Sequence, residues 1–466
     1  LNERLSTPKH TDCWVSRVDT STMMEIFENI PYHRYWRIFR VAVLYAVCNC
    51  GLQQRVVADD SSGSWTVLVF EVADNNLDCA GIRDLEEMIS ATQSIPNQVK
   101  VVVMLDRADT SSWDSCGPMR VGGVDWTSSA KEIRLQPAGQ VQVLQEWTEV
   151  NMADAGVLSG FIARNLQRFP ADHYALFMWD HGNDWRGFGG DMTPGLQDWQ
   201  GTIYPAVMTL PQMTTAIAAG LSTANVSQFS LLGFDACLMQ TFSVVASLAP
   251  FARCHLASEE LEPEHGWDYR ASLAALAQTP TMTPEELGDK IARDYLEHSN
   301  QHRTDTITLS VINTTSFESF RVQFEEVLEL WTTGLEASGE LGTRLLFGLA
   351  EARANSLQMV QAPGYEDEGL IDMGDFLAIV ARPHWKGNET AGLQGTSLLV
   401  DLHQAYDDMF ETRVQDSMMR RATGMSVYFP RTPGEFESRF CSSIAAVAAW
   451  CVFLRKYYAL AVTLSA

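Results

Sequence analysis

The sequence has few basic residues for its size. Its 466 residues include 33 Lys and Arg against 58 Asp and Glu, which gives a formal charge of −25 and a pI near 4.7. Binding of nucleic acid requires clustered Lys and Arg against the phosphates, so this composition argues against that class of partner. An acidic surface would instead attract basic peptides and raise their local concentration. The acidic residues could equally serve only to keep the protein soluble.

The nine cysteines lack the paired C-x-x-C spacing of zinc fingers and redox motifs. One or two disulfides are compatible with an oxidising compartment, but the sequence does not assign the pairs. Five cysteines in the body of the chain are interpreted as buried packing residues rather than reactive thiols. They are Cys79, Cys116, Cys254, Cys441 and Cys451.

Long apolar runs are also scarce. The segment Phe440 to Leu460 is largely apolar but contains Arg455 and Lys456 and has no 18-residue apolar core, so we expect a buried helix rather than a membrane span. Near the start, a basic stretch, 33–40, precedes a short apolar stretch, 41–50, as in an export signal.

Residues 1–64 are therefore expected to be a disordered leader with an export signal and a linker, which predicts a secreted or envelope-associated protein. Cys48 or Cys50 could carry a lipid anchor, although neither follows the usual Leu-small-small pattern. The alternative is a leader that is merely disordered or misassigned, followed by the polar linker 59–64. The oligomeric state is not indicated by any pattern.

From Trp65 onward, apolar strands alternate with helical stretches, which predicts an α/β fold with a mostly parallel central sheet flanked by helices on both faces. We expect a catalytic core over 65–280 and a helix-rich C-terminal region over 281–466 that completes the same unit. Other expectations are a long loop over 182–210, a helix over 238–248 directly after Cys237, and a helix over 398–413.

Two of the expected strands end in residues able to do chemistry. One runs from Tyr174 to His181 and Gly182, and the other from Phe229 to Cys237. Sites form at strand ends in open α/β sheets, and a Cys with a His roughly 50 residues upstream is a candidate nucleophile and base. A helix starting after Cys237 would lower its pKa, and the N–H groups of Gly182 and Cys237 could hold an oxyanion. The plain alternative is a buried core Cys and a hydrogen-bonded core His.

Several motifs in order resemble the clostripain family of cysteine peptidases over about residues 65–460. They are 73–77, the strand 101–107, 179–182 with Trp185, 233–239, 257–260 with 266–269, and 424–430. The resemblance implies a caspase-like fold and a cysteine endopeptidase in which His181 and Cys237 form the catalytic dyad. It also implies cleavage after basic residues, with Arg preferred and Lys second, and protein or peptide substrates.

Selecting a basic residue requires a carboxylate in the specificity pocket, because a buried guanidinium without a partner is very costly. Asp235 is the first candidate and Asp268 the second, while Trp267 could form a wall of the pocket. Alternatively, Asp235 caps a following helix, Asp268 lies in a solvated turn, and Trp267 belongs to the core.

The resemblance also implies self-cleavage after a basic residue between His and Cys, yet this chain has no Lys or Arg from Gly187 through Ala252, and only Arg186 is available. No cofactor is required for the chemistry. The resemblance makes calcium dependence a further hypothesis, but Asp184, Asp191 and Asp198 do not have the spacing of a known calcium loop, so no metal ligand is assigned.

Two rival functions follow from the same patterns. A catalytically silent caspase-like module could keep the fold to bind peptides. A flavodoxin-like nucleotide binder is disfavoured because no Gly-rich phosphate loop follows an early strand. Four histidines show no partner pattern and are interpreted as surface or core residues: His173, His255, His265 and His298.

Overall fold

The computed structural model describes residues 63–465 apart from gaps at 110–114, 118, 128–129, 198–202, 305, 338, 361–368, 386 and 388–396. The expected leader, with Cys48 and Cys50, and the loop residue Asp198 therefore lie outside the described residues. The described chain from 63 onward belongs to a single compact unit.

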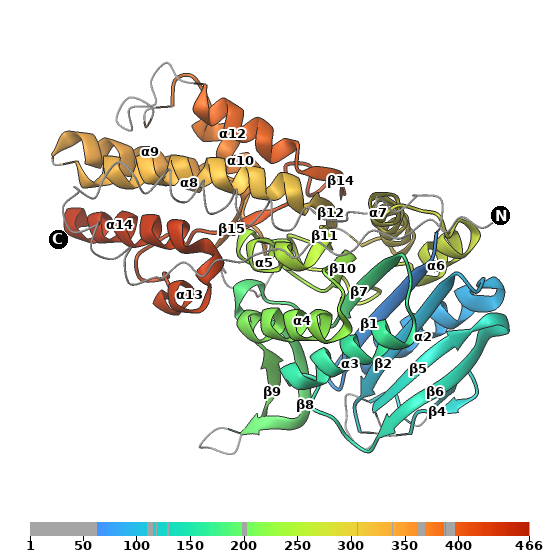
Figure 1. Ribbon diagram of the computed structural model, residues 1–466. Coiled ribbons are helices and arrows are strands. Elements are labelled where there is room, and N and C mark those ends of the chain that lie inside the picture. Colours follow the sequence, from blue (N-terminus) through green and yellow to red (C-terminus); the bar gives the residue numbers. More distant parts are fainter. Residues whose placement is uncertain are drawn as a thin grey trace, which may run out of the picture. The chain divides into compact units, whose positions relative to one another are not determined.

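The unit is built on a nine-stranded sheet with the order β14-β12-β11-β10-β7-β1-β2-β5-β6 (Figure 1). The central strands from β11 to β2 run parallel, and antiparallel pairs close both edges. The strands are β1 (Trp65–Ala73), β2 (Val99–Arg107), β5 (Ala130–Gln136), β6 (Gln140–Trp147), β7 (His173–Trp179), β10 (Phe229–Asp235), β11 (Ala252–Ala257), β12 (Thr308–Asn313) and β14 (Phe410–Gln415). The predicted α/β fold with a mostly parallel centre is confirmed.

Helices cover both faces of the sheet, which explains why every residue of β1 is buried. Successive side chains of a strand point to opposite faces, so Leu68 and Phe70 enter one apolar core while Val67 and Val69 enter the other. The first core contains side chains of α3 (Ala155–Arg168), α4 (Leu210–Ala224), α5 (Phe242–Leu248) and α8 (Thr314–Glu336). The second contains side chains of α2 (Asp78–Ala91), α6 (Tyr269–Gln278) and α7 (Pro284–His302).

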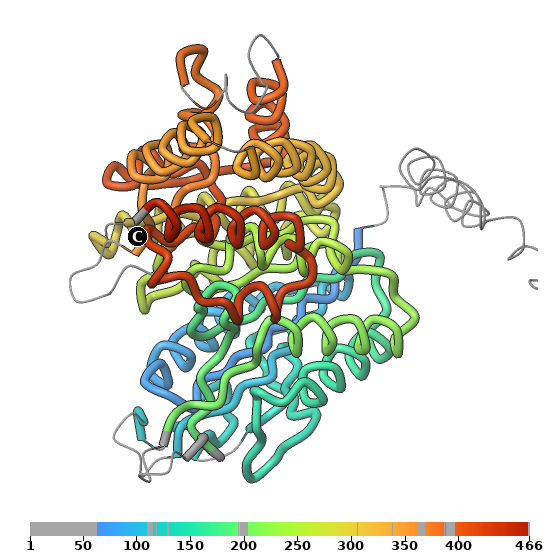
Figure 2. Tube along the Cα trace, turned by 90° about the vertical axis from the view of Figure 1, so that its left-hand side faces the viewer, coloured from blue at the N-terminus to red at the C-terminus, as the bar shows by residue number. Residues whose placement is uncertain are grey.

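The C-terminal part adds a helical layer beside the sheet (Figures 1 and 2). Its elements are α9 (Glu340–Asn355), α10 (Met373–Val380), α12 (Leu398–Asp407), α13 (Ser438–Ser443) and α14 (Ala448–Ser465), with the small pair β13 (Leu370–Asp372) and β15 (Ser426–Tyr428). In the described chain, residues 445–464 are the one helical stretch long and apolar enough to cross a membrane. Trp450, Phe453 and Leu454 of this stretch are buried, and α14 packs along α8.

Three local expectations were wrong. The expected loop 182–210 contains a hairpin of β8 (Phe188–Gln197) and β9 (Ile203–Met208), whose glycines hid the alternation expected of strands. The expected helix 398–413 ends at Asp407, and its last residues form the edge strand β14, which alternates exposed and half-buried side chains. The expected helix after Cys237 begins only at Phe242.

Four cysteines are paired, which corrects their interpretation as packing residues. The disulfides are Cys79–Cys116 and Cys441–Cys451, and Cys254 is the buried free thiol among the five. Pairing depends on how closely the two Cα atoms of each pair approach in the fold, at 5.3 and 5.4 Å, and spacing alone could not show it.

Candidate active site

The register of two central strands brings His181 and Cys237 to the same edge of the sheet. Strands β7 and β10 are parallel neighbours in which Trp179 pairs with Asp235. The N–H of Asp180 continues the ladder to the carbonyl of Asp235 at 3.3 Å. His181 and Cys237 each follow the paired residue by two positions, so both lie at the carboxyl ends of adjacent strands, where sites form in such sheets.

Gly182 allows the two strand ends to approach closely. A Cβ atom at this position would lie 2.1 Å from the carbonyl oxygen of Cys237 and 2.9 Å from the side chain of Met239. Only glycine therefore fits here. Gly182 also forms an isolated β-bridge with Phe188. The hydrogen bonds next to this bridge are donated by the N–H groups of Asn183 and Gly189, and not by the N–H of Gly182.

The turn after Cys237 is fixed by the segment that follows β11. The N–H of Leu238 donates to the carbonyl of Glu260 at 3.1 Å, and that of Gln240 to the carbonyl of Ser258 at 2.8 Å. Leu238 has a φ of +59°, an uncommon conformation for a non-glycine residue and one that is enriched near functional sites. The turn therefore depends on residues 258–260, which the sequence analysis quoted among its motifs.

The thiol of Cys237 is not activated in the way the sequence suggested. No helix begins at Cys237, and burial of the half-buried thiol raises its pKa above the usual value. The N–H of Glu262 donates to Cys237 Sγ at 3.2 Å, which opposes this rise by stabilising the thiolate. The resting thiol is therefore neutral at pH 7.

His181 is held by a residue that the sequence analysis had quoted in a motif but given no role. Its Nε2 lies 3.0 Å from Oδ1 of Asn76. An amide oxygen can only accept, so Nε2 carries the proton and Nδ1 offers the lone pair. Desolvation lowers the pKa of His181, so the ring is a neutral base near pH 7. Asn76 is neutral and acts as neither acid nor base, so a search of the sequence for acids and bases does not detect it.

Asp235 is buried in a group of acidic side chains below the strand ends. Its Oδ2 accepts the N–H of Trp267 at 3.1 Å, and no helix follows for it to cap. Burial raises the pKa of Asp235 to about 6, and raises those of Glu71, Asp84 and Glu262 well above their usual values, with repulsion from Asp235 adding to each. No Lys or Arg in the described part of the chain forms an ion pair with these carboxyl groups.

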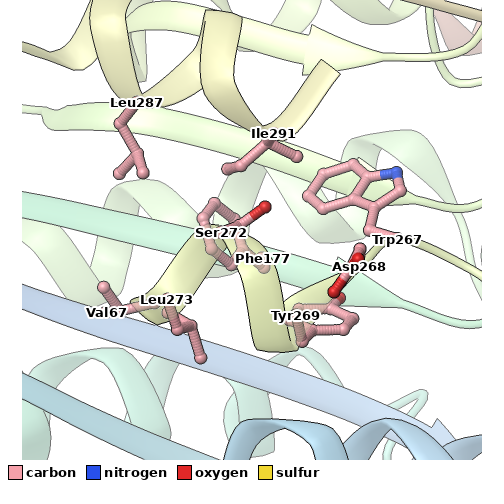
Figure 3. A pocket seen from close by; sticks show the side chains of 9 residues that line it. All are labelled: Val67, Phe177, Trp267, Asp268, Tyr269, Ser272, Leu273, Leu287 and Ile291. Carbon is pink, nitrogen blue, oxygen red and sulfur yellow. The ribbon is translucent and has the colours of Figure 1, made fainter. Parts of the chain in front are cut away.

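Asp268 and Trp267 occupy a different place. Asp268 caps α6, with its Oδ1 accepting the N–H of Ala271 at 2.7 Å. Trp267 is buried with its ring 5.6 Å from that of Phe177. Both residues line a small, mostly apolar cavity (Figure 3), which neither His181 nor Cys237 lines.

The loop aspartates considered for calcium separate into two environments. Asp184 is buried and accepts hydrogen bonds from Thr241 at 2.5 Å and Ser243 at 2.9 Å. Asp191 instead meets Asp74 and Glu149, with one carboxylate oxygen of each within 4.8 Å of the others. Burial, followed by repulsion from neighbouring carboxylates, raises the pKa values of Glu149 and Asp191 to about 7.

The histidines expected to have no partner pattern do have partners. His173 stacks on Trp65, and His255 Nδ1 lies 2.6 Å from Gln240 Oε1. His265 and His298 meet each other and His302, which corrects the expectation for both. The four-residue spacing of His298 and His302 could have indicated neighbours on one face of a helix. The approach of His265 to this pair depends on the fold.

The parallel sheet with a His and a Cys at adjacent strand ends defines a caspase-like α/β fold. The model of the clostripain family matches residues 69–427, so the chain belongs to this family of cysteine peptidases.

Clostripain of Hathewaya histolytica is 27% identical over 194 residues, which make up 40% of this chain and 36% of that protein. The chain's match thus spans little more than a third of the length of that relative. A secreted C11 cysteine protease from Bacteroides thetaiotaomicron, solved with an irreversible peptide inhibitor, has the same fold with a TM-score of 0.56 and 19% identity, over 83% of this chain and 98% of that one. An inactive zymogen C11 protease from Parabacteroides distasonis gives a TM-score of 0.55 and 15% identity, over 85% and 99% of the two chains.

Proposed function

We propose that this chain is a cysteine endopeptidase that cleaves peptide bonds after basic residues through His181 and Cys237. The observation that carries the proposal is the register of β7 and β10, which ends both strands at the same edge with these two side chains. The close approach of Gly182 to Cys237 supports it, because that contact places the backbone of the residue after His181 directly against the residue that carries the thiol.

The chemistry follows from the neutral resting states of the two groups. His181 accepts the thiol proton at Nδ1 as Cys237 Sγ bonds to the scissile carbonyl carbon. The N–H groups of Gly182 and Cys237 hold the resulting oxyanion. The imidazolium then gives its proton to the leaving amine as the C–N bond breaks. Water attacks the acyl-enzyme with His181 as base, which releases the new carboxylate and restores the thiol.

The hydrogen bond that His181 donates to Asn76 sets which ring nitrogen takes the thiol proton. With Nε2–H donated to Asn76, the ring keeps its lone pair on Nδ1 and cannot easily turn. A neutral amide also leaves the imidazolium less stabilised than a carboxylate would. The proton is therefore returned readily to the leaving group.

The preference for Arg is supported by the acidic group around Asp235. Burial raises the pKa values of these carboxyl groups, and repulsion from Asp235 adds to the rise at Glu71, Asp84 and Glu262. A substrate guanidinium would favour the ionised carboxylate of Asp235 and gain charge-assisted hydrogen bonds. Asp235 is the favoured ligand because it lies two residues before the nucleophile, whereas the carboxylate of Asp268 already caps α6. An ammonium from Lys would gain less because it lacks the planar pair of donors.

We further infer that Asp74, Glu149 and Asp191 hold a calcium ion. Calcium prefers carboxylate and carbonyl oxygens, and Oδ2 of the buried Asp74 has no hydrogen-bond partner. A cation here would neutralise three carboxylates that now repel one another. Asp191 also accepts the N–H groups of Met152 and Thr193, so the ion would brace the hairpin that follows His181.

An oxidising compartment is the proposed location, as for a secreted or envelope-associated protein. The two disulfides favour it, because such bonds are rare in reducing cytosols. The expected export signal points the same way, and a lipid anchor at Cys48 or Cys50 stays a prediction.

The test is hydrolysis of fluorogenic peptides with Arg, Lys, Asp or Ala before the scissile bond, with calcium and with a chelator. Wild type is compared with Cys237→Ala and with Cys254→Ala, which changes the other free thiol of the described residues. We expect cleavage after Arg, weaker cleavage after Lys, and a loss of roughly 10⁴-fold or more only in Cys237→Ala. Activity retained by Cys237→Ala would refute the mechanism, and inactivity of the wild type toward every peptide would favour the silent binding module.

A further inference from the structure

Three imidazoles from two separate segments meet beside the candidate active site. His298 and His302 are one helical turn apart on α7, and His265 comes from the segment between Glu262 and Asp268. One ring nitrogen of each lies within 4.8 Å of one from each of the others. The ring centroids are 4.3 to 4.9 Å apart.

The contacts of the three rings place the proton on Nδ1 and the lone pair on Nε2 in each ring. Nδ1 of His265 lies 2.9 Å from the carbonyl of Gly266, and Nδ1 of His302 lies 2.9 Å from the carbonyl of His298. A carbonyl can only accept, so each Nδ1 carries the proton and each Nε2 carries the lone pair. Nδ1 of His298 faces Oδ2 of Asp268 at 3.8 Å, which favours the same tautomer.

This arrangement is the one found around protein-bound metal ions. A ligating His usually donates its other N–H to a carbonyl or carboxylate, which orients the ring. Nε2 of His265 now contacts Oγ1 of Thr304 at 2.9 Å, but that hydroxyl can instead donate to the carbonyl of Ser299 at 3.1 Å. The lone pair can therefore be released without breaking the local structure.

The electrostatic setting also suits a cation. His298 and His302 lie in the last turn and a half of α7, where the negative end of the helix dipole favours positive charge.

We propose that His265, His298 and His302 form a binding site for a divalent transition-metal ion, with zinc as the favoured ion. Imidazole ligands suit zinc, which takes three protein ligands and leaves the fourth tetrahedral position to water or another ligand. Oxygen-preferring calcium is excluded by the three nitrogens.

The ion would fasten the segment that lies against the candidate nucleophile. Glu262, three residues before His265, donates its N–H to Cys237 Sγ, and Trp267, two residues after it, donates to Asp235. Zinc would link this segment to the end of α7. The metal site stands on its own geometry and does not depend on the proposed peptidase function.

The test uses the untagged chain carrying Cys237→Ala, so that the thiol cannot bind the ion. Cobalt(II) titration followed by visible absorption, with displacement by zinc, measures stoichiometry and affinity, and thermal unfolding gives a second readout. Two variants each remove one proposed ligand: His302→Gln, at an exposed position, and His265→Asn. The control is His403→Gln on α12, a histidine outside the cluster whose Nδ1 lies 3.8 Å from Asp407.

We expect the Cys237→Ala parent chain to bind one cobalt ion. Added zinc should displace the cobalt and raise the Tm. His302→Gln and His265→Asn should each weaken binding at least tenfold and remove the Tm rise, while His403→Gln should match the parent. Absence of an equivalent of bound ion in the parent would overturn the site. Equal binding by parent and His302→Gln would overturn it as well.

Discussion

The backbone N–H of Glu262 donates to Cys237 Sγ at 3.2 Å, so the segment after β11 lies directly on the thiol. This contact helps the thiolate but does not outweigh burial, and the pKa of Cys237 stays above its ordinary value. The free protein therefore holds a neutral thiol beside a neutral imidazole.

Alkylation of Cys237 should accordingly be slow at neutral pH. Iodoacetamide reacts with thiolate, so we expect the rate constant of the free protein to increase with pH to beyond about 9 without a plateau near pH 6 or 7. Mass spectrometry of the peptide containing Cys237 measures the rate, and Cys237→Ala gives the background from other thiols. A plateau below pH 7 would instead reveal a preformed thiolate–imidazolium pair.

Asp235→Asn should weaken cleavage after Arg much more than it changes the fold. Loss of a buried charged partner costs about 2–5 kcal/mol in such pairs, so kcat/KM for the Arg peptide should fall by roughly 30-fold to 5,000-fold. The matched control Asp268→Asn keeps a good helix cap and should retain most of the activity. If Asp268→Asn shows the larger loss, the second candidate carries the specificity.

The raised pKa of Asp235 also predicts two pH dependences of opposite sense. A guanidinium requires the ionised carboxylate, so kcat/KM for the Arg peptide should rise with pH through about 6. Because the folded-state pKa exceeds the unfolded value near 3.8, the folded state binds the extra proton. The contribution of Asp235 to stability is therefore present at low pH and is lost as pH rises from about 4 to 6. In urea unfolding of Asp235→Asn, the free energy of unfolding should not show this loss between about pH 4 and 6.

Calcium should raise the Tm of the wild type through the group of Asp74, Glu149 and Asp191. Glu149→Gln should reduce the rise, whereas Glu86→Gln, at an exposed position on α2, should leave it unchanged. Protons compete for Glu149 and Asp191, whose pKa values are raised to about 7, so apparent calcium affinity should fall as pH drops below 7. Differential scanning fluorimetry across pH 5 to 8 measures both effects, and an equal response of the two variants would reject the site.

Gly182→Ala should be far more damaging than an alanine elsewhere. Its Cβ would meet the carbonyl of Cys237, and backbone cannot move away as a flexible side chain can. We expect lower stability and loss of peptidase activity. The control Gly160→Ala places its Cβ near only the end of the Arg164 side chain and lies on α3. Normal activity in Gly182→Ala would contradict the tight approach of the two strand ends.

The chain should remain uncut between His181 and Cys237. Arg186 is held by Glu437, with Nη2 2.6 Å from Oε1, and its guanidinium packs on Trp185. A protease needs an extended, accessible segment, which this residue does not offer. Intact-mass measurement of active enzyme should show no break after Arg186. Detection of two fragments, one of which ends at Arg186, would show that the contact between Arg186 and Glu437 opens during activation.

Much of the sheet could be predicted because apolar runs such as β1 and β2 are buried on both faces and carry a clear signal. The placement of His181 and Cys237 at adjacent strand ends could be predicted for a related reason, since each follows such a run, while their role as a dyad stays a prediction. The turn at Leu238 could not, because its left-handed conformation depends on hydrogen bonds to Ser258–Glu260, a segment that only the fold brings near. The expected helix at Cys237 was wrong for that reason.

Partners from distant parts of the chain were equally hidden. The edge strands β6 and β14 carry polar or charged side chains at their exposed positions, so their hydrophobic pattern is weak. Asn76, the two disulfides and the meeting of His265 with α7 all depend on tertiary approach. Sequence periodicity contains no information about such contacts.

The C-terminal region supplies contacts to the turn that carries the nucleophile, and this has a consequence for synthesis. Gln240 binds Ser310 through its side chain and Ser426 through its carbonyl, while the carboxylate of Glu260 accepts the N–H of Val360. The ribosome releases these partners long after Cys237 itself has emerged. The growing polypeptide therefore carries its thiol on a turn that lacks these partners until translation passes Ser426, so we expect the candidate active site to form only after that point.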